Sequence, residues 1–131
     1  MLTRKDALLS VSKALPNGAA TIASDPIDLG KGPKLSDGEL LLEIPALATG
    51  LLPDTQTVTY TIESCADAAF GSGVVSHAQG TVQTGAGGAG AVATKVRHKP
   101  ASTSHRYWRA KAVKTGAANA SAASLTLSYV T

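Results

Sequence analysis

The sequence of 131 residues predicts an all-β protein, a single antiparallel sandwich or barrel of jelly-roll-like form with about seven or eight short strands. Two observations lead to this prediction. In several stretches apolar residues alternate with polar ones at a period of two, which is the spacing of a strand that buries one face. Between these stretches lie short segments rich in Gly, Pro, Asn and Asp, the residues that favour turns.

The composition sets the limits of this prediction. A chain of this length suits one domain and can bury a core without covalent cross-links. Cys65 is the one cysteine, so no intrachain disulfide can form, which fits a reducing compartment. No apolar run approaches the roughly 20 residues of a membrane span. The apolar stretch after Arg4 and Lys5 is short and interrupted by Lys13, unlike a secretory signal, and we expect no contact with a membrane.

The first 24 residues leave two alternatives open, an arm that becomes ordered against a partner or a short helix. The helix is suggested by Leu8, Val11 and Leu15, which share a helical face. A Pro-Asn-Gly sequence would end it. An irregular edge strand at Ala19–Ile27, broken at Pro26, leads into the sandwich domain, which we expect to span residues 25–131.

Two strands in the first half are well defined. Glu39–Ala46 has leucine or isoleucine at alternate positions of one face and Leu41 on the other, so we expect it to be buried. Gln56–Cys65 is rich in β-branched residues, with apolar side chains on one face and threonines on the other. In the loop that follows, Phe70 is expected to close the end of the core.

The second half continues the pattern. Val74–Thr84 fits a strand with a bulge or bend at Gly80, and Gly85–Gly90 fits a flexible turn. Ala91–His98 fits the next strand, and the last strand lies in Ser121–Val130, where apolar and polar residues alternate.

The fold is expected to be organised around the strand His105–Lys114. Trp108 shares its face with Ala110 and Ala112, which leave room for an indole, so we expect Trp108 in the core. The opposite face is basic and carries, besides Val113, the residues Tyr107, Arg109 and Lys111.

The net charge of +3 conceals an asymmetry between the two halves of the chain. All nine acidic residues lie at or before Asp67, whereas seven of the twelve Lys and Arg residues follow it. This polarity fits a surface that is complementary to a partner or a polyanion. It fits equally a sandwich that folds the two halves together and mixes their charges.

Several patterns resemble chemical motifs but lack the context that the chemistry needs. Gly85–Gly90 matches the dinucleotide-binding pattern, yet a strand-like segment follows it and no acidic residue comes later. His77, His98 and His105, with Cys65, lack the close spacing of zinc ligands. The acidic residues between positions 25 and 39 lack the alternation of a calcium loop. We therefore expect no catalytic, metal-binding or cofactor-binding residues and no enzyme, with Cys65 passive and half-buried.

The basic residues of the second half, with Tyr107 nearby, resemble a nucleic-acid-binding surface. Surfaces that stack bases usually show more than one or two aromatic side chains, and aromatics make up only 4% of this chain. An ordinary solvated face explains the same residues, so nucleic acid is not the partner that we favour. The basic residues are Lys95, Arg97, Lys99, Arg106, Arg109, Lys111 and Lys114.

Three pieces of the sequence, taken together, resemble the capsid cement, or head decoration, proteins of short-tailed bacteriophages. The first piece is Asp25–Gly30, which follows a segment rich in Ala and Thr. The second is Glu63–Phe70, at the end of a Thr-rich strand, and the third is Arg106–Arg109. The order and spacing of the pieces agree with that family over most of the chain.

The resemblance implies a jelly-roll-like domain that binds the outer surface of an icosahedral capsid and cements neighbouring coat subunits. Its partners would be the major capsid protein and a second copy of itself, and it would be made in the host cytoplasm and located on the virion. We expect partner contacts at Arg4, Lys5, Leu8, Leu9, Arg106, Tyr107, Arg109 and Lys111. The alternative is a β-sandwich module that binds a carbohydrate or nucleic acid without catalysis.

Overall fold

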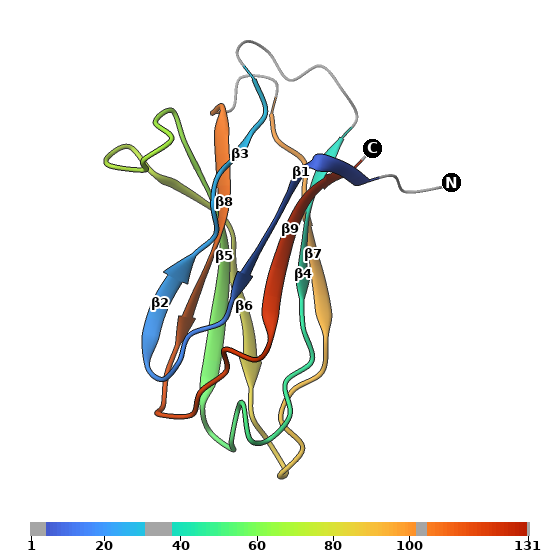
Figure 1. Ribbon diagram of the computed structural model, residues 1–131, viewed down its shortest axis with the longest axis vertical. Helices are drawn as coiled ribbons and strands as arrows, with labels where there is room; N and C mark the ends of the chain where they lie inside the picture. The colour runs from blue at the N-terminus through green and yellow to red at the C-terminus, as the bar shows by residue number, and fades with distance from the viewer. Residues whose placement is uncertain (1–4, 31–37, 102–104, 131) are drawn as a thin grey trace.

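The computed structural model describes residues 5–30, 38–101 and 105–130, which contain nine strands and no helix. The strands form two antiparallel sheets packed face to face, and Figure 1 shows these two layers. The all-β prediction is therefore confirmed, with more strands than the sequence suggested. The strands are β1 (Lys5–Ala14), β2 (Ala20–Ala23), β3 (Ile27–Asp28), β4 (Glu39–Ile44), β5 (Thr57–Cys65), β6 (Val75–Thr84), β7 (Thr94–His98), β8 (Tyr107–Lys114) and β9 (Ser124–Val130).

The order of the strands interleaves distant parts of the chain. One sheet has the order β1-β9-β4-β7, and the other has the order β2-β8-β5-β6, with the two-residue strand β3 also paired to β8. Of the described strands, only β5 and β6 are both consecutive in sequence and neighbours in a sheet. Most connections therefore pass from one sheet to the other.

Strand β8 lies in the middle of its sheet and brings Trp108 into the core. It pairs with β5 on one side and with β2 and β3 on the other. The indole of Trp108 is fully buried, as are Ala110 and Ala112 on the same face. The predicted core position of Trp108 is thus confirmed.

The core continues along β5, where the inward side chains are buried at every second position. Its largest member after Trp108 is Tyr60, whose hydroxyl donates a hydrogen bond of 2.6 Å to Oε1 of Gln83. The Nε2 of Gln83 donates in turn to the carbonyl oxygens of Pro45 and Val92, at 2.7 and 3.0 Å. Burial raises the pKa of the Tyr60 hydroxyl, so it keeps the proton that this network needs.

The helix that was one alternative for residues 1–24 is wrong for the described part of that segment. Residues 5–14 form β1, which pairs with β9, and β2 and β3 confirm the broken edge strand. Leu9 and Val11 pack against the core, whereas the hydroxyls of Ser10 and Ser12 hydrogen-bond to side chains of β9. Alternate residues therefore face inward, and strand pairing prevails over the helical spacing.

Strand β6 and the turn after it lie at the predicted positions. The register between β5 and β6 shifts between His77 and Thr81, which agrees with the bulge expected at Gly80. The turn Gly85–Gly90 is fixed by contacts, because the N–H of Gly88 donates to Asp54 at 2.9 Å and Gly90 packs against backbone. Contacts therefore order this turn, and its flexibility stays a prediction.

Candidate interaction surface

The outer face of the β2-β8-β5-β6 sheet carries a row of small side chains that crosses all four strands. Thr21, Val113, Thr59 and Val82 are Cα partners in successive strand pairs. Their neighbours along each strand pack inward, so these four side chains point away from the core. We call these four residues the threonine–valine row.

The threonine–valine row is uncharged and accessible to solvent. Val82 is 49% exposed and Val113 is 37% exposed. The uncharged surface continues through Thr57 and Thr115, whose hydroxyl oxygens lie 3.1 Å apart. An open sheet face with exposed apolar side chains and few charges is suited to contact with another protein.

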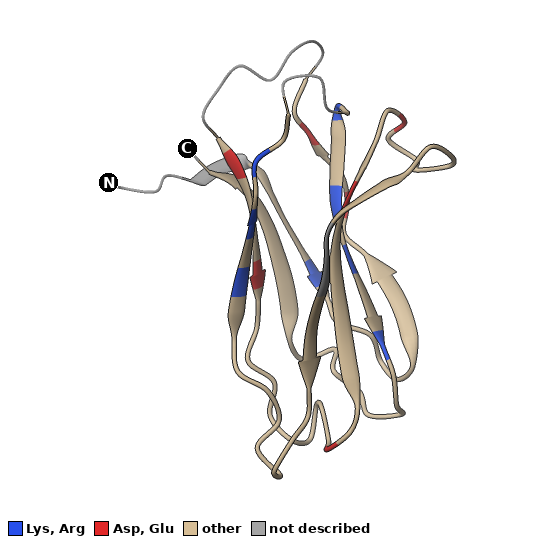
Figure 2. Ribbon diagram, turned by 180° about the vertical axis from the view of Figure 1, so that it is seen from behind, with Lys and Arg blue, Asp and Glu red and all other residues tan. Residues whose placement is uncertain are grey.

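Beside the row lies a corner where acidic residues from the first half of the chain meet basic residues from the second. Arg106 makes two charged hydrogen bonds to Asp28, at 2.6 and 2.7 Å. Nε of Arg109 lies 2.9 Å from Oε1 of the buried Glu63, and Nζ of Lys111 lies 3.7 Å from its Oε2. Figure 2 shows acidic residues beside basic ones on both sheets. The fold therefore mixes the charges of the two halves, as the second explanation of the asymmetry required.

The loop after β5 lies at this corner, and its Phe70 is buried, as predicted, at 8% exposure, although it stands apart from the main core cluster. Cζ of Arg109 lies 4.2 Å from the centroid of the Phe70 ring, which is a cation–π contact on the outer face of the sheet. Phe70 has a φ of 53° and donates its N–H to the carbonyl oxygen of Asp67. Cys65 is fully buried and not half-buried, and its thiol donates to the carbonyl oxygen of Ser72 at 3.1 Å.

The N-terminal residues predicted to contact a partner do not form a described surface. Arg4 lies outside the described residues, as do the side chains of Lys5 and Leu8. Leu9 packs against the core, so it contributes to folding first.

The residues of β8 and its start that were predicted to contact a partner are brought together, but they are engaged within the chain. Arg106, Arg109 and Lys111 take part in the ion pairs of the corner. Tyr107 is half-buried, and Cζ of Arg106 lies 5.1 Å from its ring centroid. These residues border the threonine–valine row, so the edge of the row on that side is charged.

The remaining basic residues of the second half do not share that surface. Lys114 is only 2% exposed, and its ammonium donates hydrogen bonds to Oε1 of Gln56 and to the carbonyl oxygens of Thr115 and Gly116. Burial lowers the pKa of Lys114. Arg97 lies on the other sheet and pairs with Glu39 at 3.5 Å. A continuous basic surface for nucleic acid is therefore not assembled by these residues.

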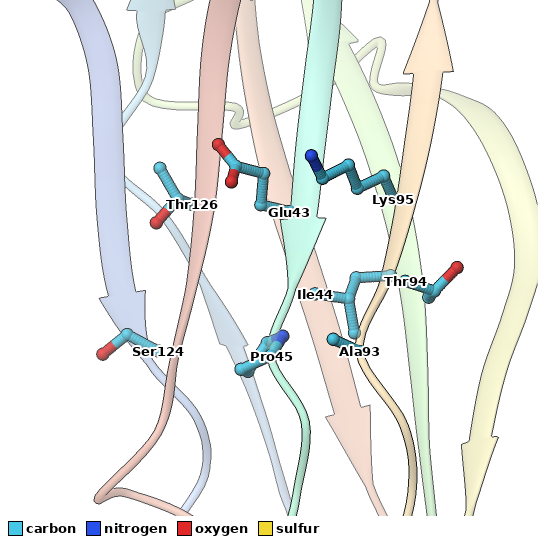
Figure 3. A pocket seen from close by; sticks show the side chains of 8 residues that line it. All are labelled: Glu43, Ile44, Pro45, Ala93, Thr94, Lys95, Ser124 and Thr126. Carbon is cyan, nitrogen blue, oxygen red and sulfur yellow. The ribbon is translucent and has the colours of Figure 1, made fainter.

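Two of the hollows on the described part of the sandwich bear on ligand binding. One of about 370 Å³ lies on the outer face of the other sheet, where Glu43 and Lys95 are Cα partners on β4 and β7 (Figure 3). The second, of about 410 Å³, lies between β6 and residues 90–94. Neither is lined by an aromatic side chain, whereas small-molecule sites are mostly lined by apolar and aromatic groups. The hollows therefore do not favour the ligand-binding alternative.

The three histidines lie together at the seam between β6 and β7. The ring centroids of His77 and His98 are 4.7 Å apart, and Oγ of Ser64 lies 2.9 Å from both Nε2 of His77 and Nδ1 of His105. The rings of His77 and His98 lie against each other, whereas in a zinc site ring nitrogens converge on one point. Within residues 5–30, 38–101 and 105–130, no group of three or more His, Cys, Asp or Glu is placed to hold a metal ion.

Sequence reasoning missed both the threonine–valine row and the histidine cluster. The alternation of threonines in β5 was a signal for an outward face, but the partners of Thr59 on β6 and β8 depend on register. The histidines come from three separate segments, so their spacing in sequence carries no signal of their contact.

No protein-family model, no curated protein and no solved structure matches the chain. In the part of the chain that the structure describes, no helix has the length and apolar character needed to cross a membrane. The functional assignment is therefore built on the geometry of the chain and on the resemblance of its three sequence pieces.

Proposed function

We propose that this protein is a structural virion protein that binds the outer surface of an icosahedral phage capsid and cements neighbouring coat subunits. The observation that carries the proposal is that the three pieces resembling cement proteins meet in the fold. Asp28 of the first piece bonds to Arg106 of the third, and Arg109 of the third contacts Glu63 and Phe70 of the second. Pieces that are distant in sequence yet support one another in one corner behave as a single structural unit, as a shared family fold requires.

The strand order supports the jelly-roll form of this proposal. If β2 and β3 are taken as one interrupted strand, each sheet has four strands. A jelly roll likewise has eight strands in two sheets, with the chain passing repeatedly between them.

The contact with the major capsid protein is proposed at the threonine–valine row and the charged corner beside it. Stable interfaces bury about 1,200–2,000 Å² in total. One face of a small sandwich supplies part of this area, so pairing of two copies would enlarge the contact with the coat. The ion pairs at the margin would fix orientation, because charges at a rim contribute to specificity more than to affinity.

Lysine substitutions in the row test this contact. Val82→Lys and Val113→Lys place a charge on exposed side chains without disturbing the core, so folding should be retained. We expect each to weaken binding to capsids that lack the protein by about tenfold or more, since a buried unpaired charge is costly. Occupancy would be measured after sedimentation of the capsids, and the fold by circular dichroism.

A matched control is Ser124→Lys, which adds the same charge at an exposed position of the other sheet. It should bind as the unchanged protein does. Equal binding by all three variants would show that the row is not the contact. A loss confined to Ser124→Lys would move the contact to the opposite face.

A further inference from the structure

The histidine cluster holds together strands that belong to different sheets. His77 lies on β6, His98 on β7, and His105 just before β8. The indole of Trp108 completes the cluster, with its ring centroid 4.7 Å from that of His77 and 5.3 Å from that of His98. All the histidines of the chain are therefore collected around one buried tryptophan.

The β6 and β7 edges are joined by two different side-chain contacts, one near each end. The two strands are the edges of separate sheets, so no backbone ladder joins them within the described strands. At one end, Gln83 on β6 donates to the carbonyl oxygens of Pro45 and Val92. At the other end, the contact is the pair of rings of His77 and His98. Only the contact between the His77 and His98 rings is made of groups whose charge changes near neutral pH.

Ser64 limits how many protons the cluster can hold. Ser64 is 1% exposed, and its hydroxyl oxygen lies between Nε2 of His77 and Nδ1 of His105. A hydroxyl has one proton to donate, so it donates to one ring and accepts an N–H from the other. If both rings are protonated, both nitrogens donate to the oxygen, and the hydroxyl proton loses its acceptor in a buried place.

The groups around the rings give an added positive charge little compensation. Ser64 faces them from β5 and Trp108 from β8, and both are neutral. The charged residues that flank them in sequence are basic, namely Arg97, Lys99 and Arg106, and the acidic residues Glu39 and Asp28 are already paired with Arg97 and Arg106. The indole face attracts one imidazolium, so a first proton is better tolerated than a second. Burial lowers the pKa of His77 and of His98, and the neighbouring histidines lower that of His77 further.

We propose that His77 and His98, with His105 linked to them through Ser64, form an acid-sensitive clasp, which holds the β6 and β7 edges together when the rings of His77 and His98 are neutral and releases them when these two rings are protonated. This inference does not depend on the proposed function. A histidine in an unfolded chain has a pKa of about 6.5. Because the folded pKa values of His77 and His98 are lower, the stabilisation is complete above that pH. It is lost as the pH falls from there through the folded pKa values.

The clasp is tested by following the full chain from pH 8 to pH 5. Trp108 is the single tryptophan, so its fluorescence reports on the cluster alone. We expect its emission to move to longer wavelength with a steepness greater than that of one proton. Amide hydrogen exchange, corrected for its intrinsic pH dependence, should accelerate at residues 75–77 and 96–98. It should not accelerate at residues 81–84, because the hydrogen bonds of Gln83 hold that end of the seam. The equilibrium constant for opening of the seam should rise about tenfold for each unit by which the pKa of a ring is lower in the folded chain than in the open one.

Two substitutions separate the clasp from a general acid effect. His98→Phe keeps an aromatic ring at the seam but cannot be protonated, and it should remove the transition. His77→Gln keeps a hydrogen-bonding group for Ser64 and should make the pH transition less steep. This variant provides a second test if His98→Phe fails to fold. Lys13→Gln, at an exposed position of β1, should leave the transition unchanged. The proposal is overturned if the unchanged protein shows no transition, if all strands open together, or if both histidine variants respond as the unchanged protein does.

Discussion

The indole of Trp108 joins the hydrophobic core to the polar seam of the sandwich. Its ring is fully buried beside Ala110 and Ala112, whose small side chains leave it the necessary space. Its Nε1 donates a hydrogen bond of 2.9 Å to the carbonyl oxygen of His105, so the one polar atom of the ring is satisfied. The centroids of the His77 and His98 rings lie 4.7 and 5.3 Å from that of the indole, which ties the core to the cluster.

Replacing Trp108 by alanine should lower the free energy of unfolding by about 3–5 kcal/mol, because a large cavity would remain between the sheets. Trp108→Phe, which keeps an aromatic ring but loses the N–H donor, should cost less. Urea denaturation followed by far-ultraviolet circular dichroism gives both values. A cost for Trp108→Ala below about 1 kcal/mol would show that the sheets close over the space or that the indole is not in the core.

At the scale of single elements, strands with strict alternation could be located from the sequence, and strands with a competing pattern could not. β4, β5, β8 and β9 lie where apolar residues recur at every second position. In β1, Leu8 and Val11 have helical spacing, whereas Leu9 and Val11 have strand spacing. Only the pairing of β1 with β9 decides between the two. Deletion of residues 1–15 would therefore remove a strand from the sheet, and it would affect folding as well as any contact with a partner.

The turn Gly85–Gly90 offers a second test at this scale. Gly88 and Gly90 both have positive φ, of 68° and 69°, but a Cβ on Gly88 would meet nothing within 4 Å whereas one on Gly90 would collide with the backbone of Leu47. Gly88→Ala should lower stability by roughly 1–2 kcal/mol through backbone strain. Gly90→Ala should cost at least about 1–3 kcal/mol more, because the collision adds to the same strain.

Thermal unfolding of the two glycine variants side by side measures this difference. Similar melting temperatures for Gly88→Ala and Gly90→Ala would mean that the turn relaxes freely, as the sequence alone suggested. A clear separation would confirm that the turn is fixed against residues 47–48.

At the scale of the whole molecule, the pairs that build the charged corner and the histidine cluster could not be predicted, because they join residues far apart in sequence. Asp28 and Arg106 are separated by 78 positions and Ser64 and His105 by 41. Which residues meet is set by strand register and by passage of the chain between sheets, and neither is encoded in local spacing. The sequence could predict that β8 has a basic face, but not that its charges would be neutralised by Glu63 and Asp28.

Reconstitution with capsids is the direct test of the proposal that the protein binds and stabilises a capsid. Purified protein would be mixed with expanded capsids that lack it, and its occupancy and the temperature at which the capsids disrupt would be measured. We expect near-stoichiometric occupancy and a higher disruption temperature, with smaller values of both for Val82→Lys and Val113→Lys. Absence of binding by the unchanged protein, or binding that leaves the disruption temperature where it was, would contradict it.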